Sequence, residues 1–277
     1  MSLVSISDGL RAGIAMNRHI VCFTGSSNDE GLKLISHLLS HGSDSVASQI
    51  CSVHDLPDSS NCLDALGCYL IPYDAADVEN EIYDYELQNQ LAVWLSKSRV
   101  PVVLVSQEDP KMIPYLRHQF WFACGERLGQ WQALPVTESV VDSIFMHNSI
   151  RRYILDLIVH LRMHRLSKPG QGGGAHSRSL NDMVLLCKWI ALTSGSSFIT
   201  PDMAQVACEQ YFPWHLQLIE SAKEESSTMY GSQEEVVEEL ISRFDTFGIK
   251  MAQEYMNPLF KQLCVVQSVM KDVIPAT

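Results

Sequence analysis

Short β-rich segments alternate with helical patterns through the first half of the chain, and this alternation limits the choice of fold more than any other feature. The clearest strand is Val100–Val105, where nearly every residue is β-branched or leucine. Such runs are typical of strands buried on both faces. We therefore expect an α/β unit whose parallel sheet is covered by helices. Weaker strands are predicted at 19–24, 48–53 and 66–71, and helices at 31–39 and 79–96.

The second half has the patterns of helices. Apolar residues at helical spacing predict a helix over 148–166 that buries one face. These residues are Ile150, Ile154, Leu157, Ile158 and Leu161. Further helices are predicted at about 180–193, 200–212, 232–244 and 257–273. The resulting division is an α/β core at 1–146, a helical domain at 147–219 and a C-terminal helical extension at 220–277.

Local signals mark the ends of these helices. Thr200-Pro201 and Asn257-Pro258 each offer an N-cap residue followed by proline at the first helical position. Ser232 and Glu235 have the spacing of a capping box. Pro213 is expected to end the helix that begins at Thr200.

Charge is distributed unevenly along the chain. With 20 Lys and Arg against 32 Asp and Glu among 277 residues, the net charge is −12, which argues against general nucleic-acid binding. Residues 151–178 nevertheless hold six basic side chains and one acidic one. We favour solvated helix faces and internal ion pairs with the acidic first half of the chain as the explanation, and keep an anion or acidic-partner site as the sharper alternative. The arginines of that alternative site are Arg151, Arg152, Arg162, Arg165 and Arg178.

The chain lacks the signs of export or membrane insertion. Its apolar runs stay far below the roughly 20 residues of a membrane span, and the first 20 residues are interrupted by charge. Its eight cysteines include no CxxC pair, which is typical of free thiols in a reducing compartment. We expect an intracellular protein of the nucleus or cytoplasm that does not bind membranes.

A phosphate-binding loop is the first site to test after an early strand. Gly25 and Gly31 follow the strand at 19–24, but their spacing is one residue longer than in a P-loop. Leu32 stands where the phosphate-binding lysine belongs, and Lys33 is not followed by Ser or Thr. Asp74 follows the strand at 66–71, where an NTPase holds its magnesium carboxylate. Ordinary turns explain these residues better, and no cofactor is predicted.

Other catalytic arrangements are weaker still. His37 with His41, and His160 with His164, have i,i+4 spacing, yet neither pair has an evident third metal ligand. The chain has no G-x-S-x-G motif and no cysteine in a known nucleophile context. The sequence therefore predicts neither a catalytic residue nor a metal site.

Several segments resemble, in their order, the parts of an AAA+ ATPase of the MoxR and magnesium-chelatase type. They are Val102–Asp109, Leu116–Phe122 and the helical half that follows. Gly174–Arg178 is similar to the family segment that presents the second sensor arginine, and Ala191–Asp202 is similar to a conserved stretch of the lid. The resemblance implies an AAA+-like parallel sheet followed by a helical lid.

This resemblance also implies site residues. It places Ser106 or Gln107 at the first sensor and Arg178 at the second. Gln119 stands where an arginine finger is expected, and the phosphate-loop lysine is missing. The chain therefore resembles an AAA+ fold that has lost its hydrolytic parts.

A more extensive resemblance covers nearly the whole chain. Six segments are similar to the fungal maintenance of telomere capping protein 2 family. They are His118–Cys124, Ile150–Leu166, Ser179–Leu186, Tyr211–Leu216, Tyr230–Ser232 and Asn257–Phe260. The resemblance implies a role in telomere capping and supplies no catalytic residues.

Three hypotheses of function follow. The first is a non-catalytic AAA+-like scaffold or adaptor that binds protein partners, not an enzyme. The second is a nucleotide-binding protein or weak ATPase that uses Arg178 and Asp74. The third, which the net charge makes the least favoured, is direct DNA binding through residues 151–178. The sequence does not name the partner.

Overall fold

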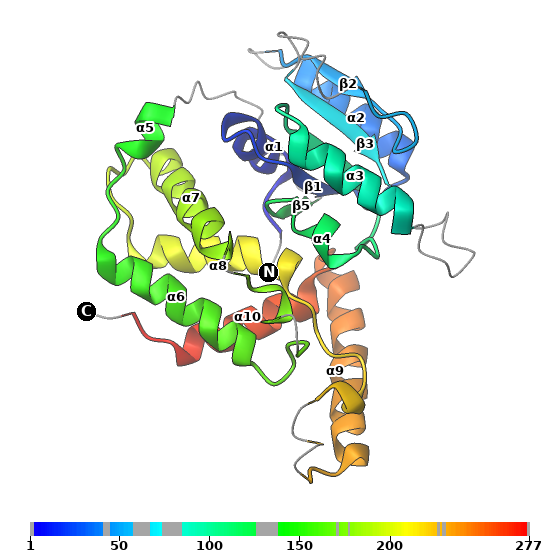
Figure 1. Cartoon of the computed structure of the whole chain (residues 1–277), viewed down its shortest axis with the longest axis vertical. Helices are drawn as coiled ribbons and strands as arrows, with labels where there is room; N and C mark the ends of the chain where they lie inside the picture. The colour runs from blue at the N-terminus through cyan, green and yellow to red at the C-terminus, as the bar shows by residue number, and fades with distance from the viewer. Residues whose placement is uncertain are drawn as a thin grey trace. The chain divides into compact units, whose positions relative to one another are not determined.

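The computed structural model divides into two compact units, Ser2–Val136 and Thr137–Thr277, called here the α/β unit and the helical unit (Figure 1). The three-part division at 1–146, 147–219 and 220–277 stays a prediction. The residues described are 3–40, 45–57, 67–73, 85–125, 138–169, 172–176, 178–225, 228 and 231–275.

The described part of the α/β unit contains a parallel five-stranded sheet with strand order β2-β3-β4-β1-β5. Its strands are β1 (Ile20–Phe23), β2 (Ser48–Ile50), β3 (Cys68–Pro72), β4 (Val102–Ser106) and β5 (Ala123–Gly125). Its helices are α1 (Ile6–Ala15), α2 (Asn28–Ser40), α3 (Tyr85–Lys97) and α4 (Pro114–Arg117). Helix α1 packs on β1 and β5, and α2 packs on β3 and β4.

The predicted parallel sheet is confirmed. Every residue of β1 and β4 is buried, as the nearly uniform apolar run of β4 indicated. Helices α1 and α4 and strand β5 were missed in this unit. Strand β5 is only three residues long, which is too short for a clear pattern.

The helical unit is built from helices of very different lengths. They are α5 (Glu138–Asp142), α6 (Asn148–Met163), η2 (Gly172–Gly174), α7 (Arg178–Thr193), α8 (Pro201–His215), η3 (Ala222–Glu224), α9 (Glu234–Tyr255) and α10 (Phe260–Asp272). Helix α10 packs on α8, α9 and α6, and α7 packs on α6 and α8 (Figure 1).

The predicted apolar stripe of α6 is confirmed, because all five of its residues are buried. The predicted start of α8 is also confirmed. Thr200 is its N-cap, and the Thr200 hydroxyl accepts the amide N–H of Met203 at 3.4 Å. Gly195, just beyond α7, has a φ of 68°, which glycine adopts without steric cost.

Several predicted helix ends in the helical unit are wrong. Helix α8 continues through Pro213 to His215, because the proline lies in its last turn among the buried side chains of Phe212 and Trp214. Helix α9 begins at Glu234 without the Ser232 cap and continues to Tyr255. Helix α10 begins at Phe260, three residues later than predicted from Asn257-Pro258, because Asn257 Oδ1 accepts the N–H of Leu259 at 2.9 Å in a turn.

In the described part of the chain, every helix is too short or too polar to cross a membrane.

Substituting Leu104 tests the role of the central strand. Leu104 of β4 is fully buried, and we expect Leu104→Ala to lower the free energy of unfolding by about 2–5 kcal/mol through lost burial and a residual cavity. The control is Val93→Ala on α3, where the side chain is 41% exposed and the change should stay within about 0.5 kcal/mol. Urea denaturation followed by circular dichroism measures both. Equal losses would contradict this placement of β4.

Candidate functional site

The corner between β1 and α2 holds the two glycines of the predicted phosphate loop. Gly25 lies in the short connection between the strand and the helix, with a φ of 61°. Gly31 belongs to the first turns of α2, where a Cβ atom would lie 2.7 Å from the side chain of Thr24. This close approach explains why a glycine is needed at Gly31 without any ligand.

The start of α2 carries negative charge. Asp29 and Glu30 lie exposed in its first turn, and Lys33 is exposed on the next turn. Carboxylates at a helix N-terminus interact favourably with the helix dipole, but they repel phosphate groups from the backbone amides that would bind them. The corner therefore combines strand–turn–helix geometry with negative charge, which disfavours phosphate binding.

The remaining candidates in this unit are not arranged as a catalytic group. The Ser106 hydroxyl at the end of β4 is buried and donates to the backbone oxygen of Glu108 at 2.8 Å. Gln107 is exposed. The amide of Gln119 donates to the backbone oxygen of Tyr115 at 3.4 Å, within its own turn. Asp74 lies outside the described residues.

In the helical unit, Arg178 is joined to a polar cluster under α7. Its Nε lies 3.3 Å from Oδ2 of Asp182, a carboxylate that is only 8% exposed. The hydroxyl of Tyr211 lies 3.4 Å from that carboxylate and 3.4 Å from the hydroxyl of Ser179. Burial is the main cause that raises the pKa of Tyr211 far above its usual value. The cluster is neutralised internally and ties α7 to α8.

The Gly-rich segment before Arg178 has a packing role. Gly174 has a φ of 88°, and a Cβ atom there would lie 1.8 Å from the backbone oxygen of His215. The backbone of Gln217 donates to Gly173 O at 3.0 Å and accepts from Lys168 N–H at 2.9 Å. The glycines thus allow two backbone segments to approach closely, which requires no bound phosphate.

Part of the basic stretch forms ion pairs within the helical unit. Arg165 Nε lies 3.0 Å from Oε1 of Glu225, whose side chain is 4% exposed. Lys168 Nζ lies 2.9 Å from Oε1 of Glu224. A hydrogen bond from the Glu220 N–H, followed by the one from Lys168, lowers the pKa of Glu224. These pairs and Arg178–Asp182 lie within the helical unit, so the predicted ion pairing with the acidic first half is not what the described residues show.

The other three arginines lie on α6 and behave differently. Arg151, Arg152 and Arg162 are exposed and form no ion pair with the residues that the structure describes. The i,i+4 neighbour Asp156 is also exposed and makes no salt bridge to Arg152. The positive charge of Arg162 adds to burial in lowering the pKa of His176, so the nearby imidazole favours its neutral form. The predicted anion patch of five arginines is therefore divided into two paired and three unpaired ones.

A hollow of about 360 Å³ lies beside Arg151 in the helical unit. Two cationic side chains, Arg151 and Lys188, line it together with the ring of Phe145, which is 62% exposed. Lys188 Nζ lies 3.4 Å from Oδ1 of Asp142, so one of the two positive charges is paired with a carboxylate. The hollow lacks a nucleophile paired with a base.

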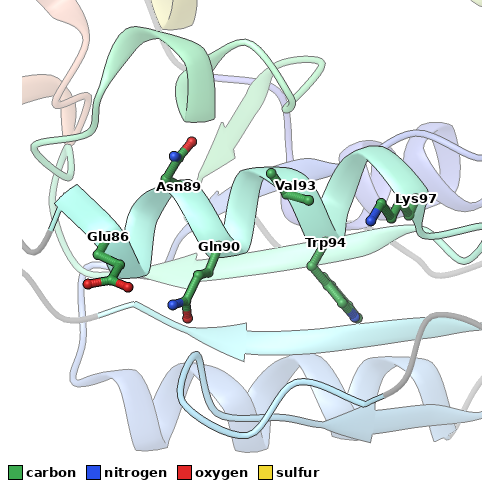
Figure 2. A pocket seen from close by; sticks show the side chains of 6 residues that line it. All are labelled: Glu86, Asn89, Gln90, Val93, Trp94 and Lys97. Atoms are coloured by element: carbon green, nitrogen blue, oxygen red, sulfur yellow. The ribbon is translucent and has the colours of Figure 1, made fainter.

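A second hollow, of about 450 Å³, runs along α3 in the α/β unit. Figure 2 shows Gln90 and Trp94 on one side of the helix and Asn89 on the other. The indole N–H of Trp94 donates to the backbone oxygen of Pro57 at 2.7 Å, and its ring meets Tyr69 edge-on at 5.5 Å. Trp94 is therefore held in a structural contact. The hollow is lined by Glu86, Asn89, Gln90, Val93, Trp94 and Lys97.

Histidine and cysteine side chains do not form a reactive centre in the described residues. His160 Nδ1 lies 2.8 Å from the backbone oxygen of Asp156, and His164 Nδ1 accepts from the N–H of Leu166 at 3.2 Å. His41 lies outside the described residues, among which no metal-ligand group of three His, Cys, Asp or Glu gathers. Burial raises the pKa of the Cys22 thiol, which faces Cys124 Sγ at 3.2 Å inside the sheet.

Sequence reasoning missed the side chains that accompany the unpaired arginines. Leu155, Val159 and Met163 are 40%, 46% and 78% exposed on α6, between and beside the arginines. Their i, i+4, i+8 spacing is visible in the sequence. The sequence pattern of the larger apolar stripe on the same helix does not show that these three side chains stay exposed. This surface can bind another molecule through apolar contact and positive charge.

No family model matches the chain. A relative from Kluyveromyces lactis, named maintenance of telomere capping protein 2, is 72% identical over 279 residues and covers 100% of both chains. A relative of the same name from Eremothecium gossypii is 36% identical over 68% of this chain and 71% of its own. The one from Saccharomyces cerevisiae strain YJM789 is 31% identical over 60% of this chain and 55% of its own.

The fold is similar to that of a crystal structure from Cytophaga hutchinsonii described as a "putative ATPase". The two align with a TM-score of 0.52 at 12% identity, covering 84% of this chain and 87% of that chain. At this identity the likeness concerns the fold alone. Together with the parallel five-stranded sheet and its flanking helices, it confirms the predicted AAA+-like fold class.

The two kinds of arginine respond differently to the same substitution. Arg165→Met leaves the buried Glu225 carboxylate without its guanidinium, and we expect a loss of about 1–3 kcal/mol in the free energy of unfolding. Arg151→Met, the matched control at an unpaired and exposed position, should change it by less than about 0.5 kcal/mol. Chemical denaturation at neutral pH compares them. A larger loss for Arg151→Met would contradict the assignment.

Proposed function

The chain belongs to the maintenance of telomere capping protein 2 family, and from this premise we propose that it acts in telomere capping as a non-catalytic scaffold that binds other proteins. In this proposal the AAA+-like fold supplies rigid surfaces, and no step of nucleotide hydrolysis is involved. A role at telomeres would place the chain in the nucleus, one of the two compartments expected from the sequence.

The observation that carries this proposal is the start of α2. A phosphate-binding corner needs backbone amides at a helix N-terminus, a lysine that reaches the phosphates and a hydroxyl for magnesium. Here the first turn presents Asp29 and Glu30, and Lys33 is exposed one turn further along the helix. Two carboxylates at this position oppose the binding of a nucleoside triphosphate.

The second sensor position supports the same conclusion. Arg178 pairs with Asp182 on its own helix, and Asp182 is the more buried partner at 8% exposure. Withdrawing the arginine toward a nucleotide would break this ion pair to a nearly buried carboxylate. A weak ATPase that depends on Arg178 is therefore the less favoured function.

The proposal predicts that nucleotide does not stabilise the protein. A ligand at 100 times its Kd stabilises the folded state by about 2.7 kcal/mol, which shifts a melting temperature measurably. We expect ATP with magnesium to leave the melting temperature unchanged, measured by differential scanning fluorimetry and checked by calorimetric titration. Arg178→Ala provides the comparison. Saturable ATP binding that this variant weakens would favour the nucleotide-binding alternative.

The same proposal predicts that the ATPase-like positions are dispensable in the cell. In a yeast that lacks its own family member and has a weakened telomere cap, the chain carrying Asp74→Asn and Arg178→Gln should restore growth as well as the unchanged chain does. Protein levels measured by immunoblot control for instability. Loss of rescue at normal protein level would contradict the non-catalytic role.

A further inference from the structure

The outer side of α6 combines unpaired positive charge with apolar side chains. Leu155, Val159 and Met163 recur at i, i+4 and i+8, so they follow one side of the helix, opposite its buried stripe. Three exposed arginines border them, and Asp156 is the one exposed acidic side chain on the helix. We call this surface the basic face. It comprises Arg151, Arg152, Leu155, Val159, Arg162 and Met163.

The outer side of α9 has the opposite charge and a similar apolar content. Val236 and Leu240 lie one turn apart and are 57% and 49% exposed, and Phe247 continues the row at 48%. Glu235 and Glu239 are exposed along the same turns, and Arg243, which lies between Leu240 and Phe247 in the row, pairs with Glu239. We call this surface the acidic face. It comprises Glu235, Val236, Glu239, Leu240 and Phe247.

Helix α9 is held in place by its other side. Val237 and Ile241 are buried with Ala222 and Ile219 in a small hydrophobic cluster, and Gly248 lets α10 approach so closely that a Cβ atom would lie 2.2 Å from the side chain of Lys261. The exposed row is therefore additional to the packing that the helix needs. Apolar rows of this size, bordered by charge, are typical of interaction surfaces.

We propose that the basic face of one copy docks on the acidic face of a second copy of the chain. The charges are complementary, because the guanidinium groups of α6 make no ion pair in the described structure and Glu235 likewise has no cation beside it. Glu239 pairs with Arg243 one turn along α9, but both side chains are more than half exposed, so that pair can exchange at little cost.

The dimensions of the two faces also agree. The apolar residues of α6 span eight positions and those of α9 span eleven, which correspond to about 12 Å and 16 Å at 1.5 Å per residue. Packing the two rows together removes apolar surface from water, while the arginines and glutamates form the charged border. Both faces belong to the helical unit, so the contact requires nothing of the α/β unit.

A second copy of the chain is the proposed partner, because the chain itself carries both complementary faces. Each face is exposed within one molecule, so neither covers the other there. In a two-fold pair, α6 of each copy would meet α9 of its partner, and both contacts would form at once. Duplex DNA fits the basic face less well, because a phosphate backbone offers nothing to Leu155 and Val159.

Charge reversal on the full chain tests the contact. The basic-face variant carries Arg151→Glu, Arg152→Glu and Arg162→Glu, and the acidic-face variant carries Glu235→Lys and Glu239→Lys. Glu238 is left unchanged because its carboxylate accepts the N–H of Ala222 at 2.8 Å. Sedimentation velocity from about 5 to 200 µM, a range that covers micromolar contacts, measures the mass. Circular dichroism and the melting temperature confirm that each variant is folded.

We expect the unchanged chain to reach twice its mass of 31.1 kDa, or a higher multiple, as its concentration rises. Each variant alone should associate at least tenfold more weakly, because like charges then face each other in both contacts. An equal mixture of the two variants should recover association, since each reversed face meets its reversed counterpart. Raising the salt concentration should weaken the unchanged assembly.

Apolar substitution separates this contact from DNA binding. Leu155→Ser with Val159→Ser keeps the arginines and should weaken self-association about as strongly as charge reversal. Salt-dependent retardation of DNA that the basic-face variant loses and the serine variant keeps, in a chain that stays monomeric, would overturn the proposal. So would a monomer at every concentration, an assembly unchanged by charge reversal, or a mixture that fails to associate.

Discussion

The turn from β1 into α2 determines what the α/β unit can do chemically. Gly31 lies so close to Thr24 that a larger residue would displace one of them, and this contact fixes how the helix leaves the sheet. The same turn carries Asp29 and Glu30 at the positive end of the helix. The helix dipole that would attract a phosphate is thus satisfied by the chain's own carboxylates. The strand–turn–helix geometry is present, and the first turn of its helix is acidic.

In the helical unit, too, residues that resemble nucleotide contacts have structural partners. Arg178 occupies the position that the AAA+ resemblance assigns to a sensor, yet its charge is balanced by the nearly buried Asp182. The Gly-rich loop before it serves the close approach of Gly174 to His215. Arg178 and Gly174 therefore each have a structural contact within the helical unit. These contacts account for both residues without a ligand.

Regional charge is the property that the structure clarified most. The sequence located an excess of positive charge at 151–178 but did not separate its members, because ion pairing depends on residues far along the chain. Glu224 and Glu225 neutralise Lys168 and Arg165 from nearly 60 residues away. No such partner reaches Arg151, Arg152 or Arg162 in the described structure. Within residues 151–178, the positive charge that is left without an ion pair in the described structure is concentrated on α6.

The sequence predicted most of the regular structure where burial has a simple period. The uniform burial of β4 and the five-residue stripe of α6 both follow from their side chains alone. Helix ends were less predictable, because tertiary packing outweighs local signals. Phe212 and Trp214 hold the last turn of α8 past Pro213, and α9 extends beyond Phe244 to Tyr255 while packing on α10. Short strands such as β5 are defined by their neighbour, not by their own three residues.

The candidate surface was less predictable than the fold for a physical reason. A catalytic site is recognised by rare residues at strict spacing, whereas a docking face uses leucine, valine, arginine and glutamate, which are common on any helix. What distinguishes Leu155 and Val159 is that they stay exposed although the helix already has a complete buried stripe. That fact depends on knowing which side of α6 meets the core and that its arginines find no acidic neighbour. Exposed faces of this kind are where the proposed scaffold would contact another molecule.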